Sequence, residues 1–511
     1  MRYQLTLIRM VALLLISGVG SLLGFARPVA AAPQAQTNPP TVHLTILHMN
    51  DVYEIMPVSG GTLGGVARVA TLKKEFQVQN PNTLLTMSGD LHGPSGLGLA
   101  VVEGELLAGK QNVAVMNTVG IDYFSYGDHE FDIYAGAQHA QRLTETQFPM
   151  ISSNVFDAEG NSFGNAKVND IRTFRNAAGQ AIRVGFFSIT EEIPRSAIPL
   201  TYLDRIEATK TQVAALRGQV DILIAMTHQG VADDLALARQ FPEIDLILGG
   251  DDHEHMKVEA GAGLAPIIKA DSNARSVQVL DLYFDTASGE LQIEDQLVAV
   301  TDMIANDSVV QTEINRWRQI AYSGFRAEGI EPSEVVAVPT VDLDGFANTI
   351  RNGPTEFTRL MLNGINATAD NPDLSVMFSA LIRMDDLIPA GGNFTMYDVI
   401  RTFPNNYDIV TIELPGSGLG FLLNFGYSAA GSGQYILTTD NVTRTASGSW
   451  AVDGQPLDPA RIYRVGTTRE AARAFSYFGA TTTAKHLVTL QQLLIQQLMN
   501  EYGPATSGAS Q

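Results

Sequence analysis

The stretch TVHLTILHMND (residues 41–51) decides the fold, because it is an apolar run of strand character that ends in a carboxylate. The pattern recurs. Similar runs lead into or lie beside SGD (88–90), YGDHEFD (126–132), AMTHQG (225–230) and LGGDDHEH (248–255). Side chains that follow the carboxyl ends of neighbouring strands can meet at one edge of a sheet. The sequence therefore predicts one cluster of aspartates and histidines, drawn from distant parts of the chain.

Helical stretches separate several of these strands. VARVATLKKEFQVQ (66–79) lies between the first two, and TKTQVAALRG (209–218) precedes DILIAMTH (221–228). Strands that alternate with helices indicate a layered α/β fold. Residues 277–300 change to alternating β segments, which suit the closing strands of a first domain.

A length of 511 residues favours two domains over one. We expect a first domain at residues 41–300 and a second at 335–505, joined by a linking helix within 301–334. The last predicted element is an amphipathic helix over AKHLVTLQQLLIQQLMNEY (484–502).

Residues 1–32 have the character of a secretory signal peptide. Arg2 and Arg9 give the positive start, residues 11–25 the apolar stretch, and residues 30–32 three alanines for cleavage. The alternative is a membrane anchor, but the apolar run is shorter than the roughly 20 residues of a spanning helix. We therefore expect export to the periplasm or the cell exterior, with no membrane span after cleavage.

The composition excludes several classes of function. The 33 basic and 54 acidic residues give a net charge of −21, which argues against a nucleic-acid polymer as partner. The chain has no cysteine, which excludes disulfides, thiolate zinc sites and a cysteine nucleophile. The oligomeric state is left open.

Carboxylates and imidazoles in this number can hold two divalent cations, with Zn, Mn or Fe suiting such a mixed donor set. Asp90 is the candidate for the carboxylate that bridges both ions. Two ions can activate water for attack on phosphorus. His129 is expected to stabilise the phosphoryl charge or protonate the leaving oxygen, and Asp132 to orient His129. The predicted metal ligands are Asp51, Asp90, Asp128, His228, His253 and His255.

These segments, in this order, resemble the 5′-nucleotidase family of calcineurin-like metallophosphoesterases. The matching pieces are ILHMND, SGD, GDHEFD, SSNV, THQG and the glycine pair before His253 and His255, of which GDHEFD is the most specific. The resemblance covers residues 41–502. It implies a four-layered α/β/β/α sandwich that carries the metals, followed by a second α+β domain that binds substrate. It also implies hydrolysis of phosphate esters of small metabolites, above all nucleotides.

In the second half, the stretch that begins SALIRMDD (379–386) resembles the part of the family that contains a phosphate-facing arginine, here Arg383. The family's second stacking aromatic lies in a Gly-Gly-Asp-Gly-aromatic loop, where this chain has AFSYFGA (474–480). The substrate contacts that the resemblance implies are Arg383, Arg401, Asn405, Tyr435 and Phe478.

Three departures from the family pattern leave alternatives open. Tyr53 stands where the family usually has a histidine, Asp128 where it has an asparagine, and Asp251 and Asp252 lie between the glycine pair and His253. A neutral phenol is a poor metal ligand. One alternative is a degenerate member that binds a ligand or partner with little or no turnover. The other is a hydrolase of nucleotide-sugars, cyclic nucleotides or non-nucleotide monoesters.

Overall fold

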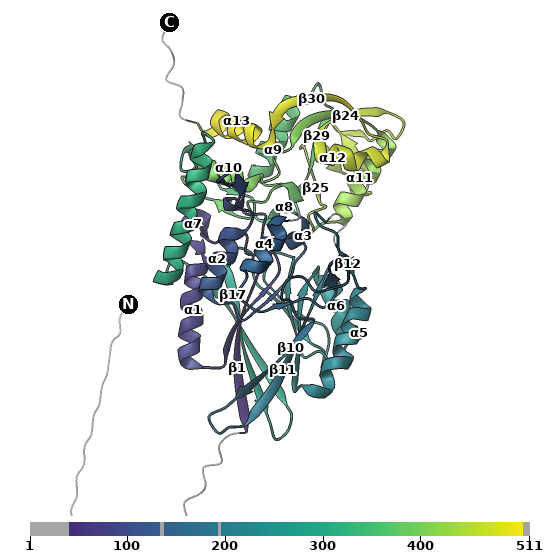
Figure 1. The fold of residues 1–511 in the computed structure, drawn as a ribbon. Coiled ribbons are helices and arrows are strands. Elements are labelled where there is room, and N and C mark those ends of the chain that lie inside the picture. The colour runs from purple at the N-terminus through teal and green to yellow at the C-terminus, as the bar shows by residue number, and fades with distance from the viewer. Residues whose placement is uncertain (1–39, 133–136, 193–195, 504–511) are drawn as a thin grey trace, which may run out of the picture. The chain divides into compact units, whose positions relative to one another are not determined.

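A computed structural model describes residues 40–132, 137–192 and 196–503 (Figure 1). The predicted signal peptide lies outside these ranges. The first sheet has the order β18-β17-β1-β4-β7-β8, and its central strands β1, β4 and β7 run parallel. It consists of β1 (Thr41–Asn50), β4 (Thr83–Ser88), β7 (Tyr123–Ser125), β8 (Met150–Ile151), β17 (Ser276–Asp285) and β18 (Leu291–Ala299).

The second sheet has the order β10-β11-β13-β14-β16-β15, with β11, β13, β14 and β16 parallel. The carboxyl ends of these strands therefore lie at one edge. Its members are β10 (Asn169–Arg175), β11 (Ala181–Thr190), β13 (Ile222–His228), β14 (Leu246–Gly250), β15 (Met256–Glu259) and β16 (Pro266–Lys269).

Alternation along β1 explains why the two sheets pack face to face. Leu44 and Ile46 point into a buried cluster that also contains Phe186 of β11 and Met226 of β13. Leu47 and Met49 belong to a different cluster, shared with helices. An apolar strand buried on both faces thus holds a sheet to one side and helices to the other.

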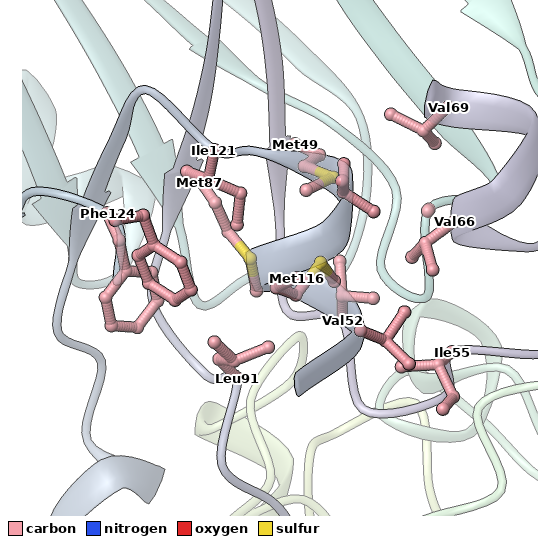
Figure 2. Packing of buried hydrophobic residues seen from close by; sticks show 14 of the residues in the cluster. Met49, Val52, Ile55, Val66, Val69, Met87, Leu91, Met116, Ile121 and Phe124 are labelled. Carbon is pink, nitrogen blue, oxygen red and sulfur yellow. The ribbon is translucent and has the colours of Figure 1, made fainter. Parts of the chain in front are cut away.

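The helices form the two outer layers, which confirms the predicted four-layered α/β/β/α sandwich. On the first sheet, Met49, Met87 and Met116 pack together near Val66 and Val69 of α1 (Figure 2). On the second sheet, Leu223 and Ala225 pack with Val213 of α5 and Leu237 of α6. The helices of this half are α1 (Val66–Gln79), α2 (Lys110–Val119), α3 (His129–Asp132), α4 (Ala137–Glu145), α5 (Arg205–Leu216), α6 (Val231–Gln240) and α7 (Ser308–Ala327).

The second half is a mixed α+β unit around a five-stranded sheet of order β25-β21-β29-β24-β30. Its strands are β21 (Leu374–Phe378), β24 (Asp408–Pro415), β25 (Ile436–Thr438), β29 (Ile462–Thr468) and β30 (Thr481–Thr489). Its helices are α8 (Ala347–Ile350), α9 (Glu356–Thr368), α10 (Met396–Thr402), α11 (Gly416–Ser428), α12 (Arg469–Phe475) and α13 (Leu490–Tyr502). Short strands complete the chain: β2 (Pro57–Val58), β3 (Leu63–Gly64), β5 (Val101–Val102), β6 (Glu105–Leu106), β9 (Val155–Phe156), β12 (Thr201–Tyr202), β19 (Val335–Ala337), β20 (Leu343–Asp344), β22 (Leu387–Ile388), β23 (Phe394–Thr395), β26 (Val442–Arg444), β27 (Trp450–Val452) and β28 (Gln455–Pro456).

The prediction of one terminal helix over residues 484–502 was wrong in its first third. Residues 481–489 form β30, which pairs antiparallel with β24. The helix α13 begins only at Leu490, because Thr489 caps it: the Thr489 hydroxyl accepts from the Gln492 amide, and the Gln492 side chain accepts from the Thr489 amide. Residues 484–489 have helical spacing of apolar side chains, but hydrogen bonding to the backbone of β24 makes them part of a strand.

His48 on β1 ties the two sheets of the sandwich together. Its Nε2 lies 2.9 Å from the carbonyl oxygen of Gly249 on β14, and its Nδ1 lies 3.0 Å from the hydroxyl of Thr86. Burial lowers the pKa of His48 from 6.5 to about 4. The imidazole of His48 is therefore neutral in the folded protein at neutral pH.

We expect acid to destabilise the protein through His48. Because its folded pKa is depressed, its contribution is complete above pH 6.5 and is lost as the pH falls towards 4. The expected loss by pH 4.5 is roughly 2–3 kcal/mol. Denaturant unfolding at pH 7 and pH 4.5 measures it, with His48→Gln as control. The two proteins losing equal stability over this range would show that His48 is not responsible.

Candidate metal centre

Four strand ends bring the acidic cluster together. Asp51 follows β1, Asp90 follows β4, His228 ends β13 and Asp251 follows β14. The Nε2 atom of His228 lies 3.3 Å from Asp128 Oδ1, 3.5 Å from Asp90 Oδ1 and 3.9 Å from Asp51 Oδ1. The predicted convergence of residues 51, 90, 128 and 228 is thus present in the structure.

The backbone at these positions adopts conformations that are uncommon for residues other than glycine. Asp51 has φ 52°, Asp90 has φ 58° and Asp251 has φ 80°. Such left-handed residues cluster at functional sites, where the surrounding structure holds them in place. Gly127 makes room for them, because a Cβ there would lie 2.2 Å from Asp90 Oδ1. The loops are therefore shaped to aim carboxylates at one point.

The cluster is buried and electrostatically coupled. Burial raises the pKa of Asp90 to about 7, and the charge of Asp128 adds to this effect. Burial would lower the pKa of His228, but Asp90 and Asp51 raise it well above its ordinary value. Burial would raise the pKa of Asp51, but His228 and His253 bring it below its ordinary value. Carboxylates this close together repel one another, so a positive charge at their centre would stabilise the cluster.

The atom that best tests the fit of a metal ion is Nε2 of His228. It is buried and makes no aligned hydrogen bond, although three carboxylates lie near it. The other ring nitrogen, Nδ1, lies 3.0 Å from the carbonyl oxygen of Ser88 and donates to it. The nearby carboxylates favour a proton on Nε2, and a metal ion that displaces this proton would meet the lone pair on Nε2, the arrangement found in histidines that bind metals. The groups that could hold an ion are Asp51–Asp90–His228, Asp90–Asp128–His129 and Asp128–His228–Asp251.

The loop after β14 departs from the sequence-based ligand set. Asp251 joins the cluster, whereas we had predicted only His253 and His255 from this loop. His253 Nε2 lies 3.4 Å from Asp51 Oδ1. His255 lies outside: its Nδ1 is 3.3 Å from Asp271 Oδ1 and its side chain is 53% exposed. The positive φ angles at Asp251 and His253 turn the chain before β15, so His255 does not face the cluster.

Asp252 is explained by the one lysine buried beneath the loop. Lys269 donates to Asp252 and to the carbonyl oxygens of Gln229 and Gly250, and its Nζ lies 2.9 Å from Asp234. Asp252 is therefore one half of a buried ion pair. The signal that could have identified Asp251 is its position directly after a strand end, which it shares with Asp51.

A cavity of about 620 Å³ opens beside the cluster. Its lining includes Asp90, Asp128 and His129, together with Arg383 and Asn405, which the sequence predicts as substrate contacts. The guanidinium of Arg383 donates to His129 Nε2 at 3.0 Å. Both groups therefore face the same point in the cavity. The lining residues that the sequence-based prediction missed include Arg351 and Phe378.

Three other predicted substrate contacts do not line this cavity. Arg401 is 7% exposed and donates to Asp386 at 2.6 Å, so it is an interior ion-pair residue. Phe478 stacks on Phe421 with ring centroids 4.8 Å apart. Tyr435 packs against the hydrophobic core of the second half. Asp132 ends α3, but its side chain lies outside the part that the structure describes, so its role in orienting His129 stays a prediction.

The sequence of residues 44–255 matches the calcineurin-like phosphoesterase family. UshA of Yersinia enterocolitica is 25% identical over 488 residues, which are 84% of this chain and 84% of that protein. The 5′-nucleotidase of Bos taurus is 27% identical over 366 residues, 65% of this chain and 61% of that protein, so the match spans less than two thirds of it.

Solved structures agree on the fold. The 5′-nucleotidase precursor of Thermus thermophilus superposes with a TM-score of 0.72 at 21% sequence identity, covering 90% of this chain and 96% of that one. The matched domain contains the strand-end aspartates and His228 that we describe. Residues 44–255 are therefore a calcineurin-like phosphoesterase domain, the chain is similar to 5′-nucleotidases over most of its length, and it is a metal-dependent phosphoester hydrolase.

Proposed function

We propose that the protein is an exported phosphoesterase that hydrolyses phosphate esters of small metabolites, with nucleotides as the first candidates. The observation that carries this proposal is the position of His129. It lies between the carboxylate cluster and the guanidinium of Arg383, in one cavity. A proton donor, an anion-binding group and a metal centre are the parts that phosphoester hydrolysis requires.

In this proposal, Asp90, Asp128, His228 and Asp251 would hold a divalent ion such as Zn²⁺, Mn²⁺ or Fe²⁺. Such an ion would supply positive charge for the phosphoryl group and would make water easier to deprotonate. Arg383 binds the phosphoryl oxygens through its planar N–H groups.

His129 is the proposed donor of a proton to the oxygen that leaves. Its Nε2 accepts from Arg383 in this structure and lies 3.9 Å from Asp128 Oδ2, so it would carry the proton once Arg383 turns to the phosphoryl oxygens. The backbone amide of His129 donates to Asp90 Oδ1 at 3.1 Å, which keeps the ring beside the metal centre.

The cavity suits a nucleotide-sized molecule, since ligand pockets of about 300–1,000 Å³ accept small organic ligands. Phe378 and Gln434 also line the cavity. A flat ring and an amide can stack on a nucleobase and hydrogen-bond to it. Phe378 would then take the place that the resemblance gives to Tyr435 or Phe478.

We also propose that the protein is exported, because residues 1–32 have the sequence pattern of a cleaved signal peptide. Over the ranges that the structure describes, every helix falls short of the length and apolar character that crossing a bilayer needs. Amino-terminal sequencing of the protein from the medium or the periplasm would identify the cleavage point. Recovery of a chain that keeps residue 1 from the cytoplasm alone would argue against export.

Turnover on a substrate panel tests the proposed activity. The metal-loaded protein is expected to release phosphate from a nucleoside monophosphate, and His129→Ala to lower kcat by about 10²–10⁴ with metal content unchanged. The panel includes a nucleotide-sugar, a cyclic nucleotide and a simple monoester. No turnover on any of them by metal-loaded, folded protein would favour the degenerate, ligand-binding alternative. Turnover only on the compound that lacks a nucleobase would change the proposed substrate class from nucleotides to non-nucleotide phosphate esters.

A further inference from the structure

The ligand atoms of the metal centre fall into two groups that share Asp90. The first group is taken from overlapping sets that could hold an ion and consists of Asp90, Asp128, His228 and Asp251; Asp51 also forms a set with Asp90 and His228. The second group consists of Asp51, Asp90 and His253, which surround the hydroxyl of Tyr53. The two groups differ in one respect that decides their occupancy: whether their polar atoms already have partners inside the protein.

In the second group, the hydroxyl of Tyr53 already contacts every ligand atom. It lies 2.6 Å from Asp90 Oδ2, 2.9 Å from His253 Nε2 and 3.2 Å from Asp51 Oδ1. Nδ1 of His253 is held by Asp385 at 3.0 Å, so both ring nitrogens are satisfied. An ion entering here would have to displace the phenol.

Tyr53 is fixed in this position from several sides. Its side chain is 2% exposed, and its backbone amide donates to Asn273 Oδ1 at 3.2 Å. The guanidinium of Arg383 lies over its ring, 5.1 Å from the centroid. Burial, the backbone hydrogen bond and the cation on its face all favour the observed position of the ring.

The first group presents the opposite case. Nε2 of His228 makes no aligned hydrogen bond, and carboxylate oxygens of Asp128 and Asp90 lie 3.3 Å and 3.5 Å from it. Carboxylates buried this close together are costly unless a positive charge lies between them, either a proton on His228 or a bound cation. Distances of this size are those between neighbouring ligands around one ion, given metal–ligand bonds of about 2.0–2.2 Å.

We propose that the protein binds one divalent ion, in the first group, and that the Tyr53 hydroxyl occupies the position of a second ion. The proposal rests on the metal centre of the proposed function and replaces the ion pair that the sequence predicts. Tyr53 then acts as a positioning residue, which holds Asp51 and His253 with hydrogen bonds in the absence of a second cation.

Metal stoichiometry tests this without any substrate. The full protein is stripped with a chelator, loaded with Mn²⁺, separated from free ion and assayed for bound manganese, with electron paramagnetic resonance to distinguish isolated from coupled ions. The wild type is expected to bind one isolated ion. Tyr53→His, which supplies an imidazole, is expected to bind two coupled ions. Tyr53→Phe is expected to keep the single ion within a few-fold of the wild-type affinity, since the first group is intact.

Other outcomes overturn the proposal. Two tightly bound ions in the wild type would do so, and a fall from two to one in Tyr53→Phe would identify the phenol as a ligand instead. Tyr53→His that stays at one ion, with a circular dichroism spectrum like that of the wild type, also counts against it. One bound ion with no turnover on any phosphoester would leave this proposal standing and sink the proposed activity.

Discussion

His228→Ala is expected to abolish metal binding and activity together. The substitution removes the one imidazole of the first ligand group, at a side chain that is fully buried. Loss even of a residue that only supports a metal ligand costs about 10–100-fold, so loss of the ligand should exceed about 100-fold in affinity. Because a bound ion supplies several kcal/mol of transition-state stabilisation, its loss should lower kcat about a thousandfold. Equilibrium dialysis against Mn²⁺ and phosphate release measure both.

His255→Ala is the matched comparison, because both residues are histidines that the sequence predicts as ligands. The structure places His255 against Asp271 with its side chain 53% exposed, so its loss is expected to change metal affinity and rate by less than about twofold. A loss like that of His228→Ala would restore the sequence-based ligand set. A His228→Ala protein that still binds manganese as tightly as the wild type would refute the role of His228.

The fold was largely predictable because the strand-ending segments combine two strong signals, apolar runs and polar residues that end them. Both faces of β1 are buried, and its residues alternate between a sheet and a helical layer. Residues 481–489 show where this reasoning fails. Helical spacing extended into a stretch that lies along β24, and pairing with a neighbouring strand outweighed local propensity.

The candidate site was predictable to the level of the segment but not of each side chain. The loop after β14 contains five consecutive acidic or imidazole residues, and only its left-handed turns decide that Asp251 and His253 face inward. Asp252 could not be assigned from the sequence, because its partner Lys269 lies 17 residues away and is buried. Tyr53 was recognised as a departure, but that its hydroxyl contacts three ligand atoms follows only from the tertiary structure.

The largest expected loss of stability from one carboxylate is at Glu130, in the GDHEFD segment. Its Oε1 accepts from the amides of Leu91 and His92 at 2.6 and 3.0 Å, and its Oε2 from those of Asp90 and Gly127 at 2.9 and 2.6 Å. Glu130→Ala would leave four buried N–H groups without a partner, each worth about 1–3 kcal/mol. We expect a loss of about 3–5 kcal/mol, since part of the set can relax towards water.

Denaturant unfolding of chelator-treated protein isolates this effect from metal binding. Glu130→Gln is the matched control, because it keeps one acceptor oxygen of the same reach and places an N–H₂ group against the remaining amides. It should fall between the wild type and Glu130→Ala in stability. Because the same four bonds fix the loops of Asp90 and Asp128, manganese affinity should fall in the same order. Equal stability of all three proteins would mean that the loops that carry the metal ligands are held by other contacts, and that Glu130 only fills space beneath them.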